Sequence, residues 1–454
     1  MKYISTRNQL KKYSFKDIII KSMPNDGGLF IPEHIPKLLI NSRTTFSFSY
    51  FVEYLLSKYM TNFEFKYFNI NYISKSVFKI DNFYNSKIFD IFKVPFFNNI
   101  NSQHYFLNLN FGKTLSFKDI SISFLSFFFN YYLIKNNLYS NVLVATSGDT
   151  GGSCLYYCKK FISLKVFVVS PYKCVSNVQE MQMFSINRFN LFNIRLIGNF
   201  DDCQNIIKSV LPNVYNLVTF NSVNFLRILI QSSYYVVSSY LLYKKHKKKV
   251  IYSIPTGNFG NCYSAFLAKK MGSKIKKVII CVNENDFLFY FFKLKCVNNT
   301  YLQNSVIKTN CPSMDISIPS NLERYVFYLK VKYFSIPLFI SNSKEGFFYV
   351  FKCYKNLRNK VIFNIYRKYR FLFDTHTCNA YCSLLKFSNV FKNYIFVIVN
   401  TANHIKFYSY INNLVNKNFV YKYNNKLSFL RKKTYIFNKK DLCKLNNFIY
   451  LNKY

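Results

Sequence analysis

The sequence lacks tryptophan altogether, has only 11 glycines in 454 residues, and carries 19 acidic residues against 62 lysines and arginines. Its formal net charge of +43 would suit a nucleic acid or an anionic membrane as partner, because such a field attracts polyanions. The many Phe and Tyr residues, 52 and 40, together with the missing Trp and scarce Gly, instead indicate codons biased toward A and T, which adds lysine as a side effect. We therefore expect no nucleic-acid partner, and we read the basic cluster at 244–249 as a solvated loop.

No apolar run is long enough for a membrane span. The uncharged apolar segments 120–134 and 228–243 fall short of the roughly 18–20 residues needed to cross a bilayer. The first 20 residues alternate charged with apolar side chains and contain no secretory core. We expect a globular protein of two or three domains, without a membrane partner and located in the cytoplasm.

The 12 cysteines are scattered along the chain rather than grouped as a disulfide framework. Two pairs, Cys154 with Cys158 and Cys378 with Cys382, are spaced by four residues, which is not a zinc-ribbon spacing. No neighbouring histidines complete a ligand set, so we expect buried thiols and no metal site.

The scarce glycines concentrate in short stretches, two of which share one pattern. Residues 141–153 and 249–272 each begin as a β-branched apolar run and turn into a loop rich in Gly, Ser, Thr or Asn. A strand, a Gly-rich loop and a helix together present backbone N–H groups and a helix dipole to an anion. Neither loop has the spacing of a Walker A or dinucleotide motif, and each alone could be an ordinary tight turn.

The apolar segments predict an α/β fold. Strand-like runs occur at 141–146, 164–170, 250–254, 277–282 and 394–399, separated by stretches long enough for crossover helices, which favours largely parallel sheets. Residues 1–95 lack this alternation and lean toward helix. We expect an N-terminal domain at 1–95, a first α/β domain at 96–240 and a second at 241–454; the stretch after about 408 is the least readable.

Lys118 precedes an aromatic segment that is apolar on all sides and predicts a buried helix. A lysine at the start of such a helix has its neutral amine favoured by low-dielectric surroundings and by the helix dipole. It could be a surface cation paired with Asp119 or a Schiff-base lysine. With pyridoxal phosphate as the carbonyl compound, one Gly-rich loop would hold its phosphate and the other a substrate carboxylate.

Ordered motifs along most of residues 1–410 resemble the threonine synthase family, pyridoxal-phosphate enzymes of the tryptophan-synthase-β-like fold, fold type II, in the longer form with an N-terminal domain. The motifs are YISTRN (3–8), PNDGGLFIPE (24–33), GKTLSFKD (112–119), ATSGDTGGS (145–153), SNVQEMQM (176–183), FDDCQ (200–204), NSVNFLRILIQSSYY (221–235), PTGNFGN (255–261), NENDFL (283–288), SMDISIPSNLER (313–324) and TANHIKF (401–407).

The resemblance implies roles for individual residues. Lys118 would bond the cofactor covalently, and Thr401 would face its pyridine nitrogen, leaving that nitrogen largely unprotonated. The cofactor phosphate would lie on one loop and the substrate carboxylate on the other. These loops comprise Gly257, Asn258, Phe259 and Gly260 for the phosphate, and Ser147, Gly148, Asp149, Thr150 and Gly151 for the carboxylate.

The implied reaction converts O-phospho-L-homoserine and water to L-threonine and phosphate. A free Lys118 amine would move protons at Cα and Cβ, phosphate would leave from Cγ, and water would add at Cβ. The leaving phosphate needs cationic or hydrogen-bonding partners. The candidates are Thr114, Ser116, Asn221, Asn224 and Arg227, with a structural ion pair as the alternative for Arg227.

Four positions depart from the family pattern. Phe111 and Lys113 stand where the family has His and Pro, and Asn403 and His404 stand where it has His and Pro. Loss of both prolines should loosen the local backbone, because Pro fixes φ. Lys113 could instead contact phosphate or be a solvated lysine.

Two other functions stay open. Another fold type II lyase, such as a serine or threonine dehydratase, would share the lysine and both loops, although residues 24–33 and 283–288 favour threonine synthase. A basic polyanion-binding protein that has lost catalysis is the non-enzyme alternative. For the main hypothesis we expect a small-molecule substrate and a monomer or homodimer.

Overall fold

The computed structural model describes residues 1–40, 47–95, 103–211, 216–294, 306–329, 346–416, 434–438 and 442–453. Its strands are β1 (Tyr3–Ser5), β2 (Phe30–Pro32), β3 (Asp90–Lys93), β4 (His104–Asn108), β5 (Ser140–Ala145), β6 (Leu164–Pro171), β7 (Leu191–Ile197), β8 (Leu217–Val218), β9 (Val250–Pro255), β10 (Ile275–Val282), β11 (Phe348–Lys352), β12 (Ile395–Asn400) and β13 (Tyr435–Asn438).

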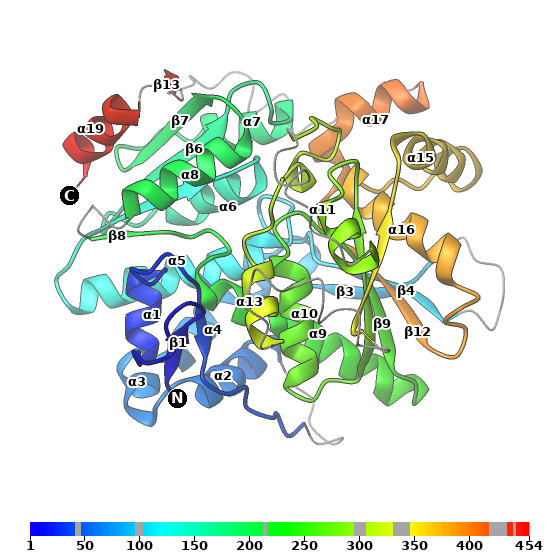
Figure 1. Cartoon of the computed structure of the whole chain (residues 1–454), viewed down its shortest axis with the longest axis horizontal. Coiled ribbons are helices and arrows are strands. Elements are labelled where there is room, and N and C mark those ends of the chain that lie inside the picture. The colour runs from blue at the N-terminus through cyan, green and yellow to red at the C-terminus, as the bar shows by residue number, and fades with distance from the viewer. Residues whose placement is uncertain are drawn as a thin grey trace.

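Helices connect these strands on both sides of the sheets (Figure 1). They are α1 (Phe15–Lys21), α2 (Phe48–Tyr59), α3 (Asn62–Tyr67), α4 (Ile70–Val77), α5 (Lys118–Lys135), α6 (Asp149–Cys158), α7 (Asn177–Phe184), α8 (Phe200–Val210), α9 (Phe225–His246), α10 (Gly260–Lys270), α11 (Phe287–Phe289), α13 (Leu322–Tyr328), α15 (Lys355–Tyr369), α16 (Thr375–Phe387), α17 (Tyr408–Val415) and α19 (Leu442–Asn452).

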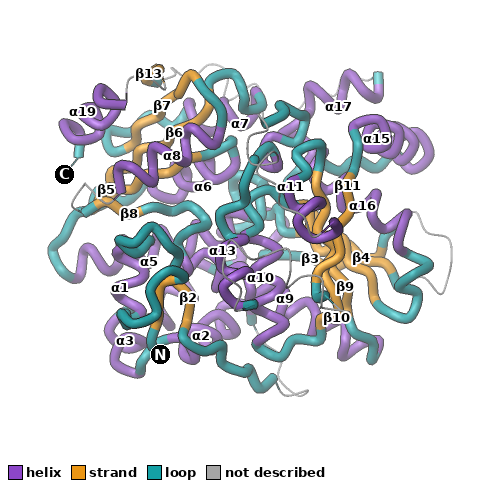
Figure 2. Tube along the Cα trace, in the orientation of Figure 1, coloured by secondary structure: helices purple, strands orange, loops and turns teal. Residues whose placement is uncertain are grey.

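Two sheets organise the fold, and Figure 2 shows them as two separate groups of strands. The larger has the order β11-β10-β9-β12-β4-β3, parallel except for β3, and the smaller has the order β13-β7-β6-β5-β8, parallel throughout. Side chains of β9 alternate between the two faces: Tyr252 and Ile254 join the core with α9 and α10, and Ile251 joins the core with α15 and α16. Each sheet is therefore buried on both faces, as parallel sheets require.

The five strands predicted from apolar runs are confirmed as β5, β6, β9, β10 and β12. In the two main sheets the sequence patterns missed β3, β7, β8 and β11, and also β4 and β13, both short. β4 and β13 each pair with a strand that is distant in the sequence: His104 of β4 pairs with Phe396 of β12, and Tyr435 of β13 pairs with Ile194 of β7. The division of the chain at 95 and 240 stays a prediction, and residues 96–102, next to the first boundary, lie outside the described residues.

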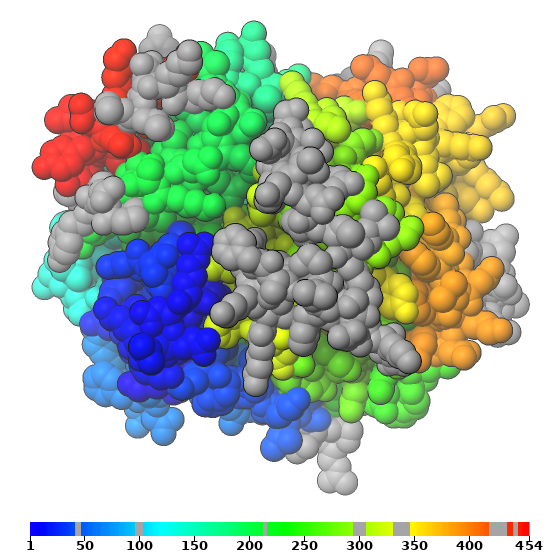
Figure 3. All heavy atoms as spheres, viewed as in Figure 1, coloured from blue at the N-terminus to red at the C-terminus, as the bar shows by residue number. Residues whose placement is uncertain are grey.

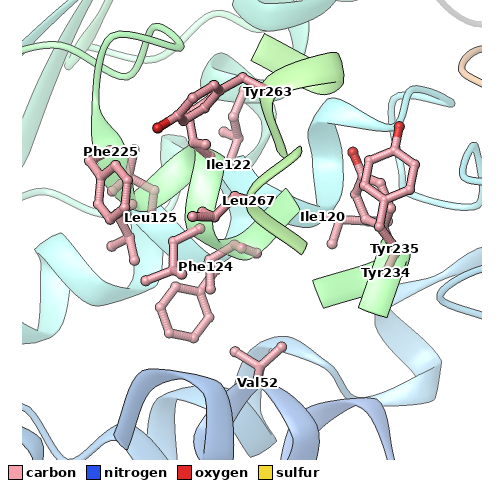
Figure 4. Close-up of a cluster of buried hydrophobic side chains, with 14 of the residues drawn as sticks. Val52, Ile120, Ile122, Phe124, Leu125, Phe225, Tyr234, Tyr235, Tyr263 and Leu267 are labelled. Carbon is pink, nitrogen blue, oxygen red and sulfur yellow. The ribbon is translucent and has the colours of Figure 1, made fainter. Parts of the chain in front are cut away.

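The N-terminal region is mainly helical, as expected, with one small antiparallel pair formed by β1 and β2. It forms one continuous part of the surface, coloured blue in Figure 3, against the elements that follow it. Val52 of α2 points toward Phe124 of α5 in the buried cluster of Figure 4, where Leu267 of α10 and Tyr263 also lie. The aromatic run after Lys118 is thus the helix that joins the N-terminal helices to α9 and α10.

The basic cluster at 244–249 is exposed apart from a half-buried His246, but its first three residues form the last turn of α9 rather than a loop. Cations at a helix C-terminus interact favourably with the helix dipole. None of the helices in the described ranges is long and apolar enough to span a bilayer. The ten cysteines with described side chains are free thiols, and the described residues contain no group of His, Cys, Asp or Glu arranged to hold a metal ion.

Arg324 of α13 links the N-terminal strands to the body of the protein. Its side chain is fully buried and donates hydrogen bonds to the carbonyl oxygens of Phe30 (3.1 Å), Ser222 (3.1 Å) and Val223 (2.6 Å). The guanidinium of Arg324 therefore joins three separate segments: α13, β2 and the loop at 222–223.

We predict that Arg324→Met lowers the free energy of unfolding by about 3–5 kcal/mol, because it leaves three buried carbonyl groups without their donor. The midpoint of urea denaturation measures this. Arg188→Met, at an exposed position, is the control and should leave the midpoint nearly unchanged. Equal midpoints for both variants would contradict the linking role.

Candidate active site

A cavity lies where strands of both sheets end, at the carboxyl ends of β5, β9 and β12. Ligands of open parallel sheets bind at such edges, since the loops that follow the strands meet there. The helices α5, α6 and α10 begin around it, near the centre of Figure 1. Its walls include these residues of the sequence analysis: Lys118, Ser147, Asp149, Thr150, Asn221, Arg227, Gly257, Asn258, Phe259, Gly260 and Thr401.

Lys118 is the first residue of α5, as the sequence predicted, and only 13% of its side chain is exposed. Its Nζ donates to Oδ2 of Asp149 at 3.1 Å and to Oγ of Ser313 at 3.4 Å. Asp119, the partner considered from the sequence, instead accepts hydrogen bonds from Thr114 and Ser153. Lys118 is therefore a cavity residue and not a surface cation.

The carboxylate of Asp149 is shared by two lysines. Its Oδ1 accepts from Lys406 Nζ at 2.6 Å and from Gln179 Nε2 at 2.7 Å, while Oδ2 accepts from Lys118. Burial by itself would raise the pKa of Asp149, but the two lysines hold it well below its usual range. Asp149 is thus an anion that fixes both amines.

The loop after β9 leads into the N-terminus of α10, as expected for an anion cradle. The first N–H groups of a helix have no acceptor within the helix, so those of α10 are available at the cavity wall. A Cβ on Gly257 would lie 2.2 Å from the carbonyl oxygen of Ser313, so only glycine fits there. Phe259 has a left-handed φ of 60° and a fully buried ring, so it offers only its backbone to a ligand.

Asn258 uses its side chain to hold neighbouring loops. Its Nδ2 donates to Oγ of Ser222 at 3.2 Å, and its Oδ1 accepts from the N–H of Ser320 at 2.6 Å. The amide therefore fixes the position of the loop between β9 and α10.

The loop between β5 and α6 is shaped by Thr146. Its Oγ1 accepts the N–H groups of both Gly148 (2.9 Å) and Gly151 (2.8 Å). Gly148 has φ of +126°, a conformation that favours glycine, and the Gln179 side chain lies where a Cβ would be. Neither Gly148 nor Gly151 belongs to the cavity wall, so the groups that face a ligand come from Ser147 and the first residues of α6.

Thr401 follows β12 and lies in the cavity wall, with 5% of its surface exposed. Its carbonyl accepts the N–H of Phe117 at 2.9 Å, and its own N–H donates to Oγ1 of Thr377 at 3.2 Å. Both backbone groups are used, so the side-chain hydroxyl is what Thr401 can offer to a ligand.

Arg227 is 2% exposed and lines the cavity. One of its nitrogens donates to the carbonyl of Phe220 at 2.8 Å, while its Nε has no hydrogen-bond partner. Burial lowers the pKa of its guanidinium to about 10, which still leaves it charged at neutral pH. Asn261 has a second unpartnered buried donor, Nδ2, at the same cavity.

Three of the phosphate candidates do not belong to the cavity wall. Asn224 caps α9 and donates to Ser22 and Thr219. Thr114 binds Asp119 through its hydroxyl, and Ser116 accepts the N–H of Lys118. Their polar groups thus already have partners within the protein.

The positions that depart from the family pattern lie around this site without entering its wall. The Lys113 ammonium lies 4.8 Å from the centre of the Tyr84 ring. Asn403 caps the turn that contains His404 by accepting the N–H of Ile405, and burial lowers the pKa of His404. Phe111 is 9% exposed and packs in the main core.

Sequence reasoning assigned no role to several residues that complete the site. Lys406 lies in a recognised motif, but nothing distinguished it from the other cations. Ser313 and His376 line the cavity, and Nε2 of His376 accepts the N–H of Ser313 at 3.2 Å. Because a backbone N–H can only donate, Nδ1 carries the proton and donates to Asp374 at 2.9 Å. The chain has only five histidines, and the position of His376 two residues after Asp374 was the sequence signal that could have indicated this contact.

Comparison with known proteins identifies relatives along most of the chain. Residues 2–75 match the family described as "Threonine synthase N terminus", and residues 91–330 match "Pyridoxal-phosphate dependent enzyme". Threonine synthase of Methylobacillus glycogenes is 33% identical over 338 residues, which cover 72% of this chain and 70% of the relative. That of Saccharomyces cerevisiae is 33% identical over 356 residues, covering 73% of this chain and 67% of the relative.

Solved structures resemble the whole chain. Yeast threonine synthase has a TM-score of 0.81 at 26% identity, covering 99% of this chain and 98% of that one. Threonine synthase from Escherichia coli has a TM-score of 0.84 at 20% identity and covers both chains fully, at 100% each. The expected fold type II architecture of parallel-sheet α/β units with a helical N-terminal region is thereby confirmed.

We predict that Gly257→Ala weakens binding of the expected pyridoxal phosphate at least about tenfold, because the added methyl group would collide with the Ser313 carbonyl and move the loop before α10. Equilibrium titration followed by visible absorbance measures the affinity. Gly152→Ala in α6 is the matched control, since its added Cβ would have no neighbour closer than 3.8 Å. Unchanged binding in Gly257→Ala would contradict the cradle.

Proposed function

Because the chain belongs to the threonine synthase family of pyridoxal-phosphate-dependent enzymes, we propose that it converts O-phospho-L-homoserine and water to L-threonine and phosphate in the cavity around Lys118. The observation that supports this best is the set of groups that surround Lys118. Its buried amine faces one cavity that also receives two helix N-termini and the unpaired Nε of Arg227.

The residues of the cavity fit the cofactor of the family. Lys118 Nζ would bond its aldehyde carbon, and the N–H groups at the start of α10, after Gly257, would hold its phosphate. The Thr401 hydroxyl would face its pyridine nitrogen. The unpartnered donors on Arg227 and Asn261 leave the cavity with an excess of hydrogen-bond donors, which suits phosphate groups.

When bound, pyridoxal phosphate withdraws electrons from an amino acid joined to it and so makes the protons at Cα and Cβ removable. Lys118 then supplies the base. Burial lowers the pKa of its amine, which increases the fraction of neutral amine that can act as a base. Lys118 Nζ would move protons at the substrate Cα and Cβ.

The substrate carboxylate would lie at the N-terminus of α6. The N–H and hydroxyl groups of Thr150 would supply donors there, with the hydroxyl of Ser147 if it turns from Oγ of Ser313 at 3.4 Å, and the helix dipole favours an anion. Gly148 and Gly151 would shape this loop, since their N–H groups are bound to Thr146. Asp149 would hold Lys118 in place.

The leaving phosphate would be held chiefly by Arg227, with Asn221 beside it in the wall. Asn221 already bonds both backbone groups of Ala145, so it would contribute more by fixing the wall than by donating to the ligand. For Thr114, Ser116 and Asn224 we propose supporting roles, because other protein groups occupy their polar atoms.

The remaining expectations stand as proposals. We propose a cytoplasmic enzyme, monomeric or homodimeric, with a small-molecule substrate and no nucleic-acid partner. We also propose the domain division at 95 and 240. The dehydratase and the polyanion-binding protein are the competing functions that the first experiment below distinguishes.

We predict that the purified protein with pyridoxal phosphate releases equal amounts of phosphate and threonine from O-phospho-L-homoserine. Lys118→Ala should lose the visible absorbance band of the bound cofactor and reduce the rate by about 10³ or more, because it removes both the attachment point and the base. Lys113→Ala, with its ammonium on the Tyr84 ring, is the control and should keep both.

Other outcomes would favour the alternatives. Conversion of threonine to 2-oxobutyrate as the main activity would indicate a dehydratase. A protein without a visible band in either form would support the polyanion-binding alternative.

We predict that Arg227→Met raises the KM for O-phospho-L-homoserine by about 10- to 100-fold, because a phosphate loses a charge-assisted donor. Inhibition by inorganic phosphate should weaken in parallel. Arg227→Lys, which keeps a charge, should lose less. In the wild type, KM should rise as the pH approaches about 10, where half of the Arg227 guanidinium groups have lost their proton. An unchanged KM in Arg227→Met would place the phosphate elsewhere.

A further inference from the structure

Lys406 is a second lysine at the site, and its side chain has no exposed surface. It lies in the short turn His404–Phe407 that follows β12 and Thr401. A buried lysine is rare in proteins and needs a partner for its charge. Lys406 has two: it donates to Oδ1 of Asp149 at 2.6 Å and to the carbonyl of Thr114 at 2.9 Å.

The carboxylate of Asp149 therefore contacts two amines, and its single negative charge can balance only one positive charge. The contact to Lys406, at 2.6 Å, is shorter than the contact to Lys118, at 3.1 Å. If Lys406 is charged, it and Asp149 form a neutral pair. A proton on Lys118 would then add an uncompensated charge inside the protein, which is unfavourable.

The other charged and titratable groups around Lys118 do not supply a second anion. Arg227 faces the same cavity as a further cation. His376 is a neutral hydrogen-bond acceptor toward Ser313. The carboxyl group of Asp119 accepts hydrogen bonds from Thr114 and Ser153 and not from Lys118, and burial raises its pKa, which favours its neutral form.

The electrostatics of Lys118 agree with this geometry. Burial lowers the pKa of its ammonium, Asp149 opposes the change, and the charges of Lys406 and Arg227 lower the pKa further. Lys406 thus acts on Lys118 in two ways: it repels a proton there and it occupies the carboxylate that would otherwise stabilise one.

We propose that Lys406 is a positioning residue that holds Asp149 and thereby keeps the Lys118 amine uncharged and ready to form its bond to carbon. This role deepens the proposed function and rests on it, since Lys118 is the reacting group there. The cation need not touch substrate or cofactor, and it is not part of the cavity wall.

The test measures the titration of Lys118 directly in the full-length protein before pyridoxal phosphate is added. Trace acetylation with acetic anhydride between pH 6 and 10, followed by mass spectrometry of the Lys118 peptide, gives the fraction of neutral amine. Lys406→Gln and Lys406→Met should raise the pKa of Lys118 by about one unit, which shifts the whole acetylation curve by about one pH unit and slows acetylation up to about tenfold on its acid side. Circular dichroism checks that each variant is folded.

Two further variants separate charge from packing. The double variant Lys406→Gln/Asp149→Asn removes a neutral pair, so Lys118 should titrate close to the wild type and no buried charge is left alone. Lys277→Gln is the matched control, because Lys277 is also a buried lysine bonded to a carbonyl, that of Gly346, and lies outside the cavity wall. It should leave the titration of Lys118 unchanged.

The proposal is overturned if folded Lys406→Gln or Lys406→Met titrates Lys118 like the wild type, or if the double variant shifts it as far as the single one. A shift with no threonine formation by the wild type would support the role of Lys406 while refuting the proposed reaction. Threonine formation by the wild type without a shift in the variants would support the proposed reaction and refute the role of Lys406.

Discussion

The carboxylate of Asp149 is the constraint on which the centre of the molecule depends, because two cations and an amide donor from distant parts of the chain meet on it. Lys118 arrives with α5, Lys406 with the turn after β12, and Gln179 with α7. Removing this one anion would leave two amines in a low-dielectric interior without compensation, which costs far more than an exposed ion pair. The position of the amine proposed to react depends on that pairing.

Charge alone does not identify the functional cations of this protein. Its 62 lysines and arginines give an exposed surface rich in positive charge, as the cluster at the end of α9 illustrates. What distinguishes Lys118, Arg227 and Lys406 is that they lie largely out of solvent in or beside one cavity, where a charge acts strongly and few carboxylates balance it. A cavity lined in this way favours small ligands with phosphate groups. It does not by itself favour a polyanion, whose binding depends on surface charge.

Local patterns predicted the central strands, the two Gly-rich loops and the buried helix behind Lys118, because each of these is encoded within a few neighbouring residues. The sequence could not predict which side chains meet across the fold. The contact of Lys406 with Asp149 and the contact of His376 with Ser313 join residues far apart in the chain. β4 and β13 were missed for the same reason, since short strands depend on distant partners for their stability. The assignment of Asn224 as a phosphate ligand came from motif position, whereas the structure uses it as a helix cap.

The place of β12 in its sheet bears on how the protein folds during synthesis. β12 lies between β9 and β4, so the strand that closes the sheet is made near the end of the chain. β4 can pair with the nearby β3, but its other edge must wait until Phe396 is made for His104 to pair with it, and such distant pairing is slow because of the entropy of closing a long loop. Until then the free edge of β4 favours aggregation or chaperone binding. Lys118 thus leaves the ribosome long before the segment that completes its surroundings.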